Sequence, residues 1–165
     1  MCASFSSARQ RRRSRGFTAI ELVAVIVLMG VLAVVALPSV TGALSFRGDQ
    51  WRDQVLAALR YAQSTAQSHR RLVCASVATN AVTLTIATAN GATTCASSLT
   101  GPNGGADYAT DTRSLATAVA PSGTLYFQTN GRITTDGAGT TATDRTITIS
   151  GQTSISVVAE TGLVR

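Results

Sequence analysis

The longest feature of the hydrophobic pattern is an apolar run from Phe17 to Leu37 that contains one charged residue, Glu21. A helix of this length extends for about 30 Å, the thickness of the hydrocarbon core of a bilayer. Five arginines lie just before the run, at positions 9, 11, 12, 13 and 15, and clustered arginines stay on the cytoplasmic side of a membrane. The pattern therefore predicts one membrane-spanning helix, with the residues after it outside the cytoplasm.

The apolar run stops at Pro38, which removes one helical hydrogen bond and favours a kink in the helix. From Asp49 onward the pattern becomes amphipathic, with apolar residues at every third or fourth position. We expect this outer half of the helix to end near His69, where the next two arginines suit the carbonyl end of the helix dipole. Its buried stripe is predicted to consist of Trp51, Val55, Leu59, Ala62 and Ala66.

The rest of the chain has the pattern of β-strands separated by turns. Segments 72–77 and 82–86 predict one hairpin, and segments 145–150 and 153–159 predict a second. Further strands are expected at 114–120 and 123–128, whereas the turn-rich segment 97–112 is expected to be a surface loop. A long helix followed only by strands predicts the α+β class, with antiparallel sheet packed on the helix.

The net charge of +6 suggests nucleic acid or an anionic membrane as a partner. This indication weakens for the part of the chain from Phe17 onward, because five of the 14 basic residues lie before it. Nine arginines then remain against eight acidic residues, a net charge of about +1. The basicity of the chain is mostly a signal for its orientation in the membrane.

Two of the three cysteines, Cys74 and Cys95, lie beyond the apolar run, whereas Cys2 lies before it. In an exported domain such a pair is a disulfide candidate, with two free thiols as the alternative. A zinc site needs about four ligands, and His69 is the only other soft candidate. A calcium site built from Asp107, Asp111 and Asp136 is a further alternative, although these residues do not form a spaced ligand series. We expect no metal or other cofactor.

The segment from Arg11 to Leu22 carries a more specific pattern: a basic leader, then Gly16, Phe17 and Thr18, then Glu21 within an unbroken apolar run. This pattern resembles the class III signal of type IV prepilins and type II secretion pseudopilins. The resemblance implies cleavage between Gly16 and Phe17 by a prepilin peptidase and N-methylation of Phe17. It also implies that Glu21 neutralises the amino terminus of a neighbouring subunit during filament assembly, and that Pro38 stands where pilins commonly carry a helix-breaking proline.

Three other interpretations of the amino terminus remain. An ordinary secretory signal also combines a basic region with an apolar region, and Thr41-Gly42-Ala43 would serve as its cleavage site. A twin-arginine signal is a second alternative, and a plain single-span anchor is a third. Both kinds of signal have an apolar region of about 7 to 15 residues, whereas this one is longer and contains an acid.

Beyond the signal, the chain resembles the FimT and pseudopilin H branch of the family, which includes the minor pilin C of the mannose-sensitive haemagglutinin pilus. The resemblance rests on an aryl-alanine element at 59–64, a Phe-x-x-x-Gly-Arg element at 127–132 and a Gly162 to Arg165 tail. It implies a type IV pilin-like fold with a long stem helix. It divides the chain into a cleaved leader (1–16), the membrane and filament-core half of the stem (17–43) and an exported globular domain (44–165).

The implied function is that of a minor pilin or pseudopilin, a structural subunit that primes assembly of a type IV pilus or secretion pseudopilus or acts at its tip. The implied partners are other pilins, the inner-membrane assembly platform and the prepilin peptidase, with the globular domain in the periplasm. No enzyme activity or small-molecule substrate is expected, because no catalytic constellation is suggested by one histidine and scattered acids.

DNA uptake is the alternative function, since FimT-like members capture DNA through arginines of the carboxyl-terminal tail. Arg132, Arg145 and Arg165 are the candidate contacts here. The tail Gly162-Leu163-Val164-Arg165 is one arginine short of the usual Gly-Arg-x-Arg ending. Three arginines neutralise few phosphates, so we expect weak, salt-sensitive binding at best.

Overall fold

The structure is a computed structural model that describes residues 17–112 and 115–165, without the side chains of residues 34–45. These ranges contain one helix, α1 (Ala19–His69), and nine β-strands. The chain divides into two compact units, Met1–Thr41 and Gly42–Arg165. The α+β class predicted from the sequence is confirmed.

Local hydrogen bonding explains where α1 begins and ends. The hydroxyl oxygen of Thr18 accepts a hydrogen bond from the N–H of Glu21 at 3.4 Å, which is the usual role of threonine before a helix. At the other end Arg70 has a positive φ of 51°, and the N–H of Arg71 donates to the carbonyl of Ala66 at 3.2 Å. This left-handed termination ends the helix at His69.

The larger sheet has the strand order β3-β2-β1-β6-β7, with β4 paired to β2 beside β3. The predicted hairpin of the first two strands is confirmed, because β1 and β2 pair antiparallel up to Val77 and Val82. The segment predicted as a loop instead contributes two short strands, both paired with β2. The bounds are β1 (Val73–Val77), β2 (Ala81–Ile86), β3 (Ser97–Leu99), β4 (Ala109–Thr110), β6 (Leu125–Phe127) and β7 (Ile133–Thr134).

The smaller sheet has the order β5-β8-β9, and its central strand forms the second predicted hairpin with β9. Its strands are β5 (Thr117–Ala120), β8 (Arg145–Ile149) and β9 (Ile155–Val157). The outer edge of β9 is covered by the chain's own tail, since Val157 bridges Val164. Ser156 and Arg165 exchange both of their backbone hydrogen bonds at the same edge, at 2.7 and 3.0 Å.

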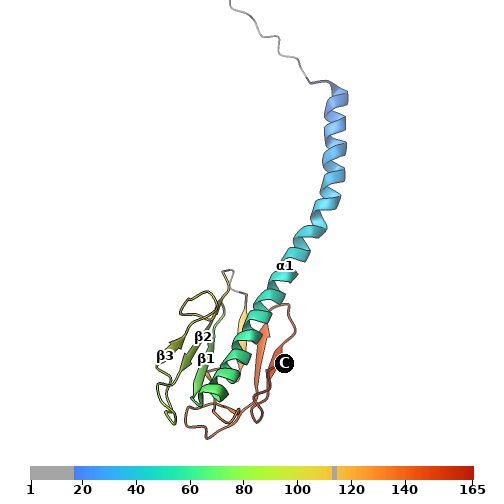
Figure 1. Cartoon of the computed structure of the whole chain (residues 1–165). Helices are drawn as coiled ribbons and strands as arrows, with labels where there is room; N and C mark the ends of the chain where they lie inside the picture. The colour runs from blue at the N-terminus through green and yellow to red at the C-terminus, as the bar shows by residue number, and fades with distance from the viewer. Residues whose placement is uncertain (1–16, 113–114) are drawn as a thin grey trace, which may run out of the picture. The chain divides into compact units, whose positions relative to one another are not determined.

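One hydrophobic core joins the outer half of α1 to both sheets, and Figure 1 shows this half of the helix beside β1 and β2. The predicted apolar stripe of α1 is fully buried in it, because residues spaced by three or four lie on one helix face. The helix supplies Trp51, Val55, Ala58, Leu59, Ala62 and Ala66; the larger sheet supplies Val73, Ala75, Val82, Leu84, Ile86, Leu125, Phe127 and Ile133; the smaller sheet and tail supply Ile147, Ile149, Ile155, Val157 and Val164.

Polar side chains on another side of α1 hold the tail. The guanidinium of Arg60 donates to the carbonyl oxygen of Val164 at 3.3 and 3.4 Å. The side-chain amide of Gln63, one turn further along, donates to the carbonyl of Thr161 at 3.1 Å. The last residues of the chain are therefore an integral part of the folded domain.

Candidate functional site

The amino-terminal segment described by the structure begins at Phe17, whose side chain is 76% exposed. Thr18 caps α1, and Glu21 lies in its first turn. A carboxylate in this turn is favourable because the amino end of a helix carries partial positive charge. Thr18-x-x-Glu21 also matches the spacing of a capping box, which is a sequence signal for the start of a helix at this position. Glu21 therefore has a local role in addition to any role between subunits.

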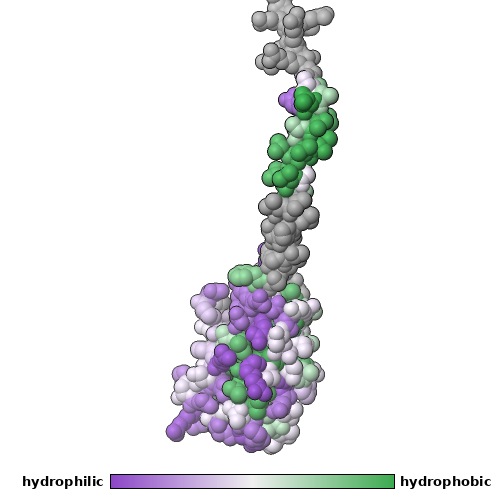
Figure 2. Space-filling model, turned by 90° about the vertical axis from the view of Figure 1, so that its right-hand side faces the viewer, coloured by the Kyte–Doolittle hydropathy of each residue, from purple (hydrophilic) through white to green (hydrophobic). Residues whose placement is uncertain are grey.

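The side chains around Glu21 form an apolar surface that no described residue covers. Eleven large apolar side chains between Phe17 and Leu32 are 40–79% exposed, and Figure 2 shows this surface in green along the described part of the helix. Among the residues that the structure describes, no helix has an apolar stretch long enough to cross a membrane. The end of the predicted span, residues 34–37, has no described side chains.

The structure gives no surroundings for two of the predicted site residues. Gly16, the residue before the predicted cleavage site, lies outside the described residues. Pro38 lies within the helical range of α1, but its side chain belongs to the part that is not described. Cleavage, methylation and the kink at Pro38 stay predictions.

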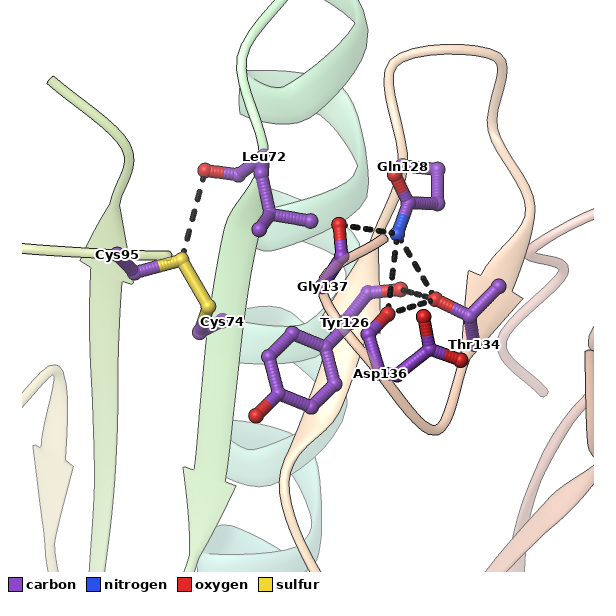
Figure 3. The surroundings of a disulfide bond; sticks show 8 residues. All are labelled: Leu72, Cys74, Cys95, Tyr126, Gln128, Thr134, Asp136 and Gly137. Carbon is purple, nitrogen blue, oxygen red and sulfur yellow. Dashed lines mark hydrogen bonds between the residues drawn. A yellow bond between two sulfur atoms is a disulfide. The ribbon is translucent and has the colours of Figure 1, made fainter. Parts of the chain in front are cut away.

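Cys74 and Cys95 form a disulfide with a sequence separation of 21, which confirms the predicted pairing. Cys74 lies on β1, and the bond ties this strand to the loop that follows β2 (Figure 3). The Sγ atom of Cys95 lies 3.6 Å from the carbonyl oxygen of Leu72. Leu72, Cys74 and Ala87 form a small second core beside the disulfide, so the bond holds the loop against packed residues.

A neighbouring network fixes the turn between β7 and β8 (Figure 3). The buried hydroxyl of Thr134 donates to the carbonyl of Asp136 at 2.7 Å and accepts from the side-chain amide of Gln128 at 2.8 Å. A Cβ atom at Gly137 would lie 1.8 Å from the carbonyl oxygen of Thr93. The turn after β7 therefore packs closely against the loop that contains Cys95.

The first of the three candidate DNA contacts, Arg132, is engaged within the domain. Its guanidinium donates two hydrogen bonds to the carboxylate of Glu160, at 2.9 and 3.0 Å. The hydrogen bond with Glu160 and its negative charge raise the pKa of Arg132 above the ordinary arginine value. A phosphate would have to approach this arginine beside a carboxylate, which repels it.

Arg145 cannot belong to an exposed strip of arginines, and this part of the prediction is wrong. Its side chain is only 3% exposed, because position 145 lies on the same face of β8 as Ile147 and Ile149. The guanidinium donates to the carbonyls of Pro121 and Ser122, while its Nε atom has no partner among the described residues. Burial lowers the pKa of Arg145, although an arginine remains charged at neutral pH.

Arg165 is exposed, and its Nε donates to the hydroxyl of Ser156 at 3.2 Å. It is the one member of the predicted trio that is exposed and not paired with an acid in the described ranges. The predicted trio thus consists of an ion-paired arginine, a buried arginine and a single exposed tail arginine. This arrangement lacks the row of free cations that binding to a phosphate backbone requires.

The three aspartates of the calcium alternative have separate local roles. Asp107 accepts a hydrogen bond from the Thr83 hydroxyl at 2.8 Å, and Asp111 accepts one from the N–H of Leu115 at 2.9 Å. Asp136 accepts from Thr140, whose hydroxyl is the main cause of the lowered pKa of Asp136. Among the described residues, no group of three or more histidine, cysteine, aspartate or glutamate side chains is arranged to hold a metal ion.

Comparison with protein families, with curated proteins and with solved structures finds no match to this chain.

Proposed function

We propose that this chain is a minor subunit of a type IV-family filament, either a type IV pilus or a type II secretion pseudopilus, and that it primes assembly or acts at the filament tip. In this proposal α1 is the stem helix of a type IV pilin-like fold. The observation that carries it is the exposed apolar surface of the amino-terminal part of α1, with one carboxylate in its first turn.

Such a surface requires an apolar environment, and the described residues do not provide one. Fully burying a large apolar side chain contributes about 1.5 to 3 kcal/mol, and eleven of them lie exposed between Phe17 and Leu32. Because these side chains are 40–79% exposed, their combined transfer is worth about 10 kcal/mol or more. A membrane supplies this environment before assembly, and the neighbouring stems supply it in a filament.

Glu21 is the residue that distinguishes a filament stem from a plain membrane anchor. A carboxylate among apolar groups is costly unless it has a cationic partner, and the described residues place no cationic side chain against Glu21. Cleavage after Gly16 would create an amino group at Phe17, which is positively charged near neutral pH because its ordinary pKa is about 7.7 to 8.0. The same group on a neighbouring subunit would be the partner of Glu21.

The partners in this proposal are the prepilin peptidase, other pilins or pseudopilins and the inner-membrane assembly platform. The globular domain lies in the periplasm, and the chain crosses the inner membrane once until it enters the filament. No cofactor is required, since the proposed role is structural.

Amino-terminal mass spectrometry of membrane-extracted protein tests the processing step. We expect methyl-phenylalanine at Phe17 when a prepilin peptidase is present. Gly16→Val should leave the leader attached, because the peptidase cleaves directly after this residue in the family that the signal resembles. A mature terminus at Leu44 would instead support an ordinary secretory signal and overturn the proposal.

Variants of Glu21 test the assembly step. Glu21→Gln keeps a polar side chain in the first turn and removes only the charge, so processing should survive while incorporation into filaments falls. Thr18→Ala is the matched control, because it removes the helix cap, worth about 1 kcal/mol, and leaves the carboxylate in place. Normal incorporation of Glu21→Gln would contradict the pairing of Glu21 with an amino terminus.

A further inference from the structure

We propose that the globular part of the chain binds a neutral, N-acetylated sugar residue in a hollow between α1 and the loop before β4. This tyrosine hollow is lined by Gln54 and Ala57 of α1 and by Pro102, Asn103, Tyr108 and Ala109 of the loop and strand. Its volume is about 290 Å³, at the lower end of the range for small-molecule sites. The proposal goes beyond the role in a filament and does not depend on it.

The aromatic border of the hollow is held by two elements of the fold. The rings of Tyr61 and Tyr108 stack, with their centroids 5.2 Å apart and their planes 28° apart. Tyr61 lies one helical turn beyond Ala57 on α1 and is 41% exposed, whereas Tyr108 packs partly against the main core. The face of an aromatic ring carries partial negative charge, and the C–H groups of a sugar carry partial positive charge. A sugar ring therefore gains from contact with this pair.

The polar groups of the hollow are neutral and available. In the ranges 17–112 and 115–165, the side-chain amides of Gln54 and Asn103 and the hydroxyl of Tyr108 make no hydrogen bond. Each amide offers two donors and one acceptor, which match the carbonyl and the N–H of an acetamido group. Burial and the neighbouring Tyr61 raise the pKa of Tyr108, so its hydroxyl keeps its proton and can donate. No charged side chain lines this hollow in the described part of the chain, so a charged ligand would find no ion pair.

The loop that closes the hollow is fixed by its own hydrogen bonds. The N–H of Tyr108 donates to the carbonyl of Val82 at 2.8 Å, and the N–H of Gly104 donates to the carbonyl of Gly101 at 2.9 Å. A Cβ atom at Gly101 would overlap the backbone of Tyr108, so the two ends of the loop lie in contact. A site that is formed before the ligand arrives loses less conformational entropy on binding.

A proline-rich peptide is the competing ligand, since such segments bind grooves lined by aromatic residues. The small volume of the hollow favours a single sugar residue over an extended peptide. The two free amides favour an acetamido group, whose methyl can lie against Ala57 and Pro102. The sequence predicts no small-molecule ligand because Gln54 and Asn103 lie far apart in it and meet only in the fold.

Titration of the full chain with triacetylchitotriose, followed by NMR of the isotope-labelled backbone amides, tests the proposal. The protein is held in a detergent without a sugar headgroup, because such a headgroup would compete for the site. We expect saturable shifts in residues 54–61 and 101–110, with a dissociation constant of about 1 mM or tighter. Chitotriose, which carries amines in place of the acetamido groups, should bind about tenfold more weakly because it loses hydrogen bonds to the amides.

Substitutions in the hollow separate binding from folding. Ala57 is exposed on α1, so Ala57→Leu should fill the hollow and abolish binding while the unfolding midpoint stays unchanged. Ala57→Ser is the matched control, because it leaves the space open and should bind as the wild type does. Asn103→Asp keeps the size of the side chain but replaces the amide by a carboxylate, and it should lower the affinity about tenfold.

Three results would overturn the inference. The saccharide causes no shifts at about 10 mM, the shifts persist in Ala57→Leu, or chitotriose binds as tightly as its acetylated form. If a proline-rich peptide shifts the same signals and the saccharide does not, the hollow is a peptide site and the proposal is wrong. None of these results bears on cleavage before Phe17, which tests the role in a filament separately.

Discussion

The disulfide between Cys74 and Cys95 leads to a quantitative prediction about stability. Replacing both residues with alanine removes the bond that ties β1 to the loop after β2. The loop then keeps its contacts with the small core around Leu72 and with the turn at Gly137, and the hydrogen bond from the N–H of Ala96 to the carbonyl of Ile86. We expect the domain to fold but with a lower free energy of unfolding.

The magnitude follows from the separation of 21 residues. On the chain-entropy model, closing a loop of this size in the unfolded state is worth about 3 kcal/mol. Unfolding a domain of roughly 120 residues has an entropy of roughly 250 cal/mol/K, so the melting temperature should fall by about 12 °C. The pairing of β1 with β2 in the folded domain does not reduce this value, because the disulfide stabilises the fold by lowering the conformational entropy of the unfolded chain.

The fragment Gly42–Arg165, one compact unit with its own core, is suited to the assay. Urea unfolding gives the free energy, and hydrogen exchange locates the change. Exchange should accelerate most between Ala87 and Ala96 and least in the hairpin of β8 and β9. Reduced wild type is the matched control, since it keeps both sulfur atoms and loses only the bond.

If loss of chain entropy is the cause, reduced wild type and the double alanine variant should lose the same amount. A drop in the alanine variant alone would indicate lost packing around Cys74, which is 8% exposed. Reduced wild type within about 1 kcal/mol of the oxidised protein would refute the reasoning from loop closure.

Three further predictions concern the tail, a turn and the arginines. Gly162 has φ 68°, and a Cβ atom there would lie 2.2 Å from a backbone oxygen, so Gly162→Ala should cost about 2 kcal/mol or more in urea unfolding. Gly91→Ala, with φ 80° and nothing within 4 Å, should cost about 1 kcal/mol, and equal losses would contradict the role of the close contact. Hydrogen bonds from Thr140 lower the pKa of Asp136 in the folded domain. The ionised carboxylate therefore stabilises the fold at pH values above its unfolded pKa of about 3.9. This stabilisation is lost as the pH falls through the lower pKa of the folded state. The difference in unfolding midpoint between wild type and Asp136→Asn should therefore shrink in acid, and a constant difference down to strongly acidic pH would count against it. Finally, the fragment Gly42–Arg165 should not shift duplex DNA at physiological salt; micromolar binding that Arg165→Ala abolishes would favour DNA uptake instead.

The parts of the fold that the sequence predicts are those governed by local periodicity. The stripe from Trp51 to Ala66 recurs at helical spacing, and β2, β8 and β9 alternate between buried and less buried positions, so burial follows from the pattern. The short strands β3 and β4 have no such signal. They form because the edge of β2 offers them backbone hydrogen bonds, and this edge exists only in the folded sheet.

The candidate site also has features that local sequence patterns predict and features that they do not. The pairing of Cys74 with Cys95 was predictable because the only other cysteine in the sequence, Cys2, lies in the predicted leader. The burial of Arg145 also follows from the alternating pattern of β8, in which Arg145, Ile147 and Ile149 lie on one face. The charge of the side chain predicts the opposite, because arginine is mostly exposed in proteins. The ion pair of Arg132 joins residues 28 positions apart, and no local signal in the sequence indicates it.

The way in which α1 holds the tail has a consequence for the timing of folding. Val164 contributes a buried side chain to the core, and Arg60 binds its carbonyl oxygen. The hydrophobic core of the domain is therefore complete only after these residues have been synthesised. Until then the stripe of α1 and the edge of β9 stay uncovered, and exposed apolar surface and free strand edges are the features that make a nascent chain prone to aggregate. A chaperone that protects this chain would have to act until residues 161–165 are available to complete the core.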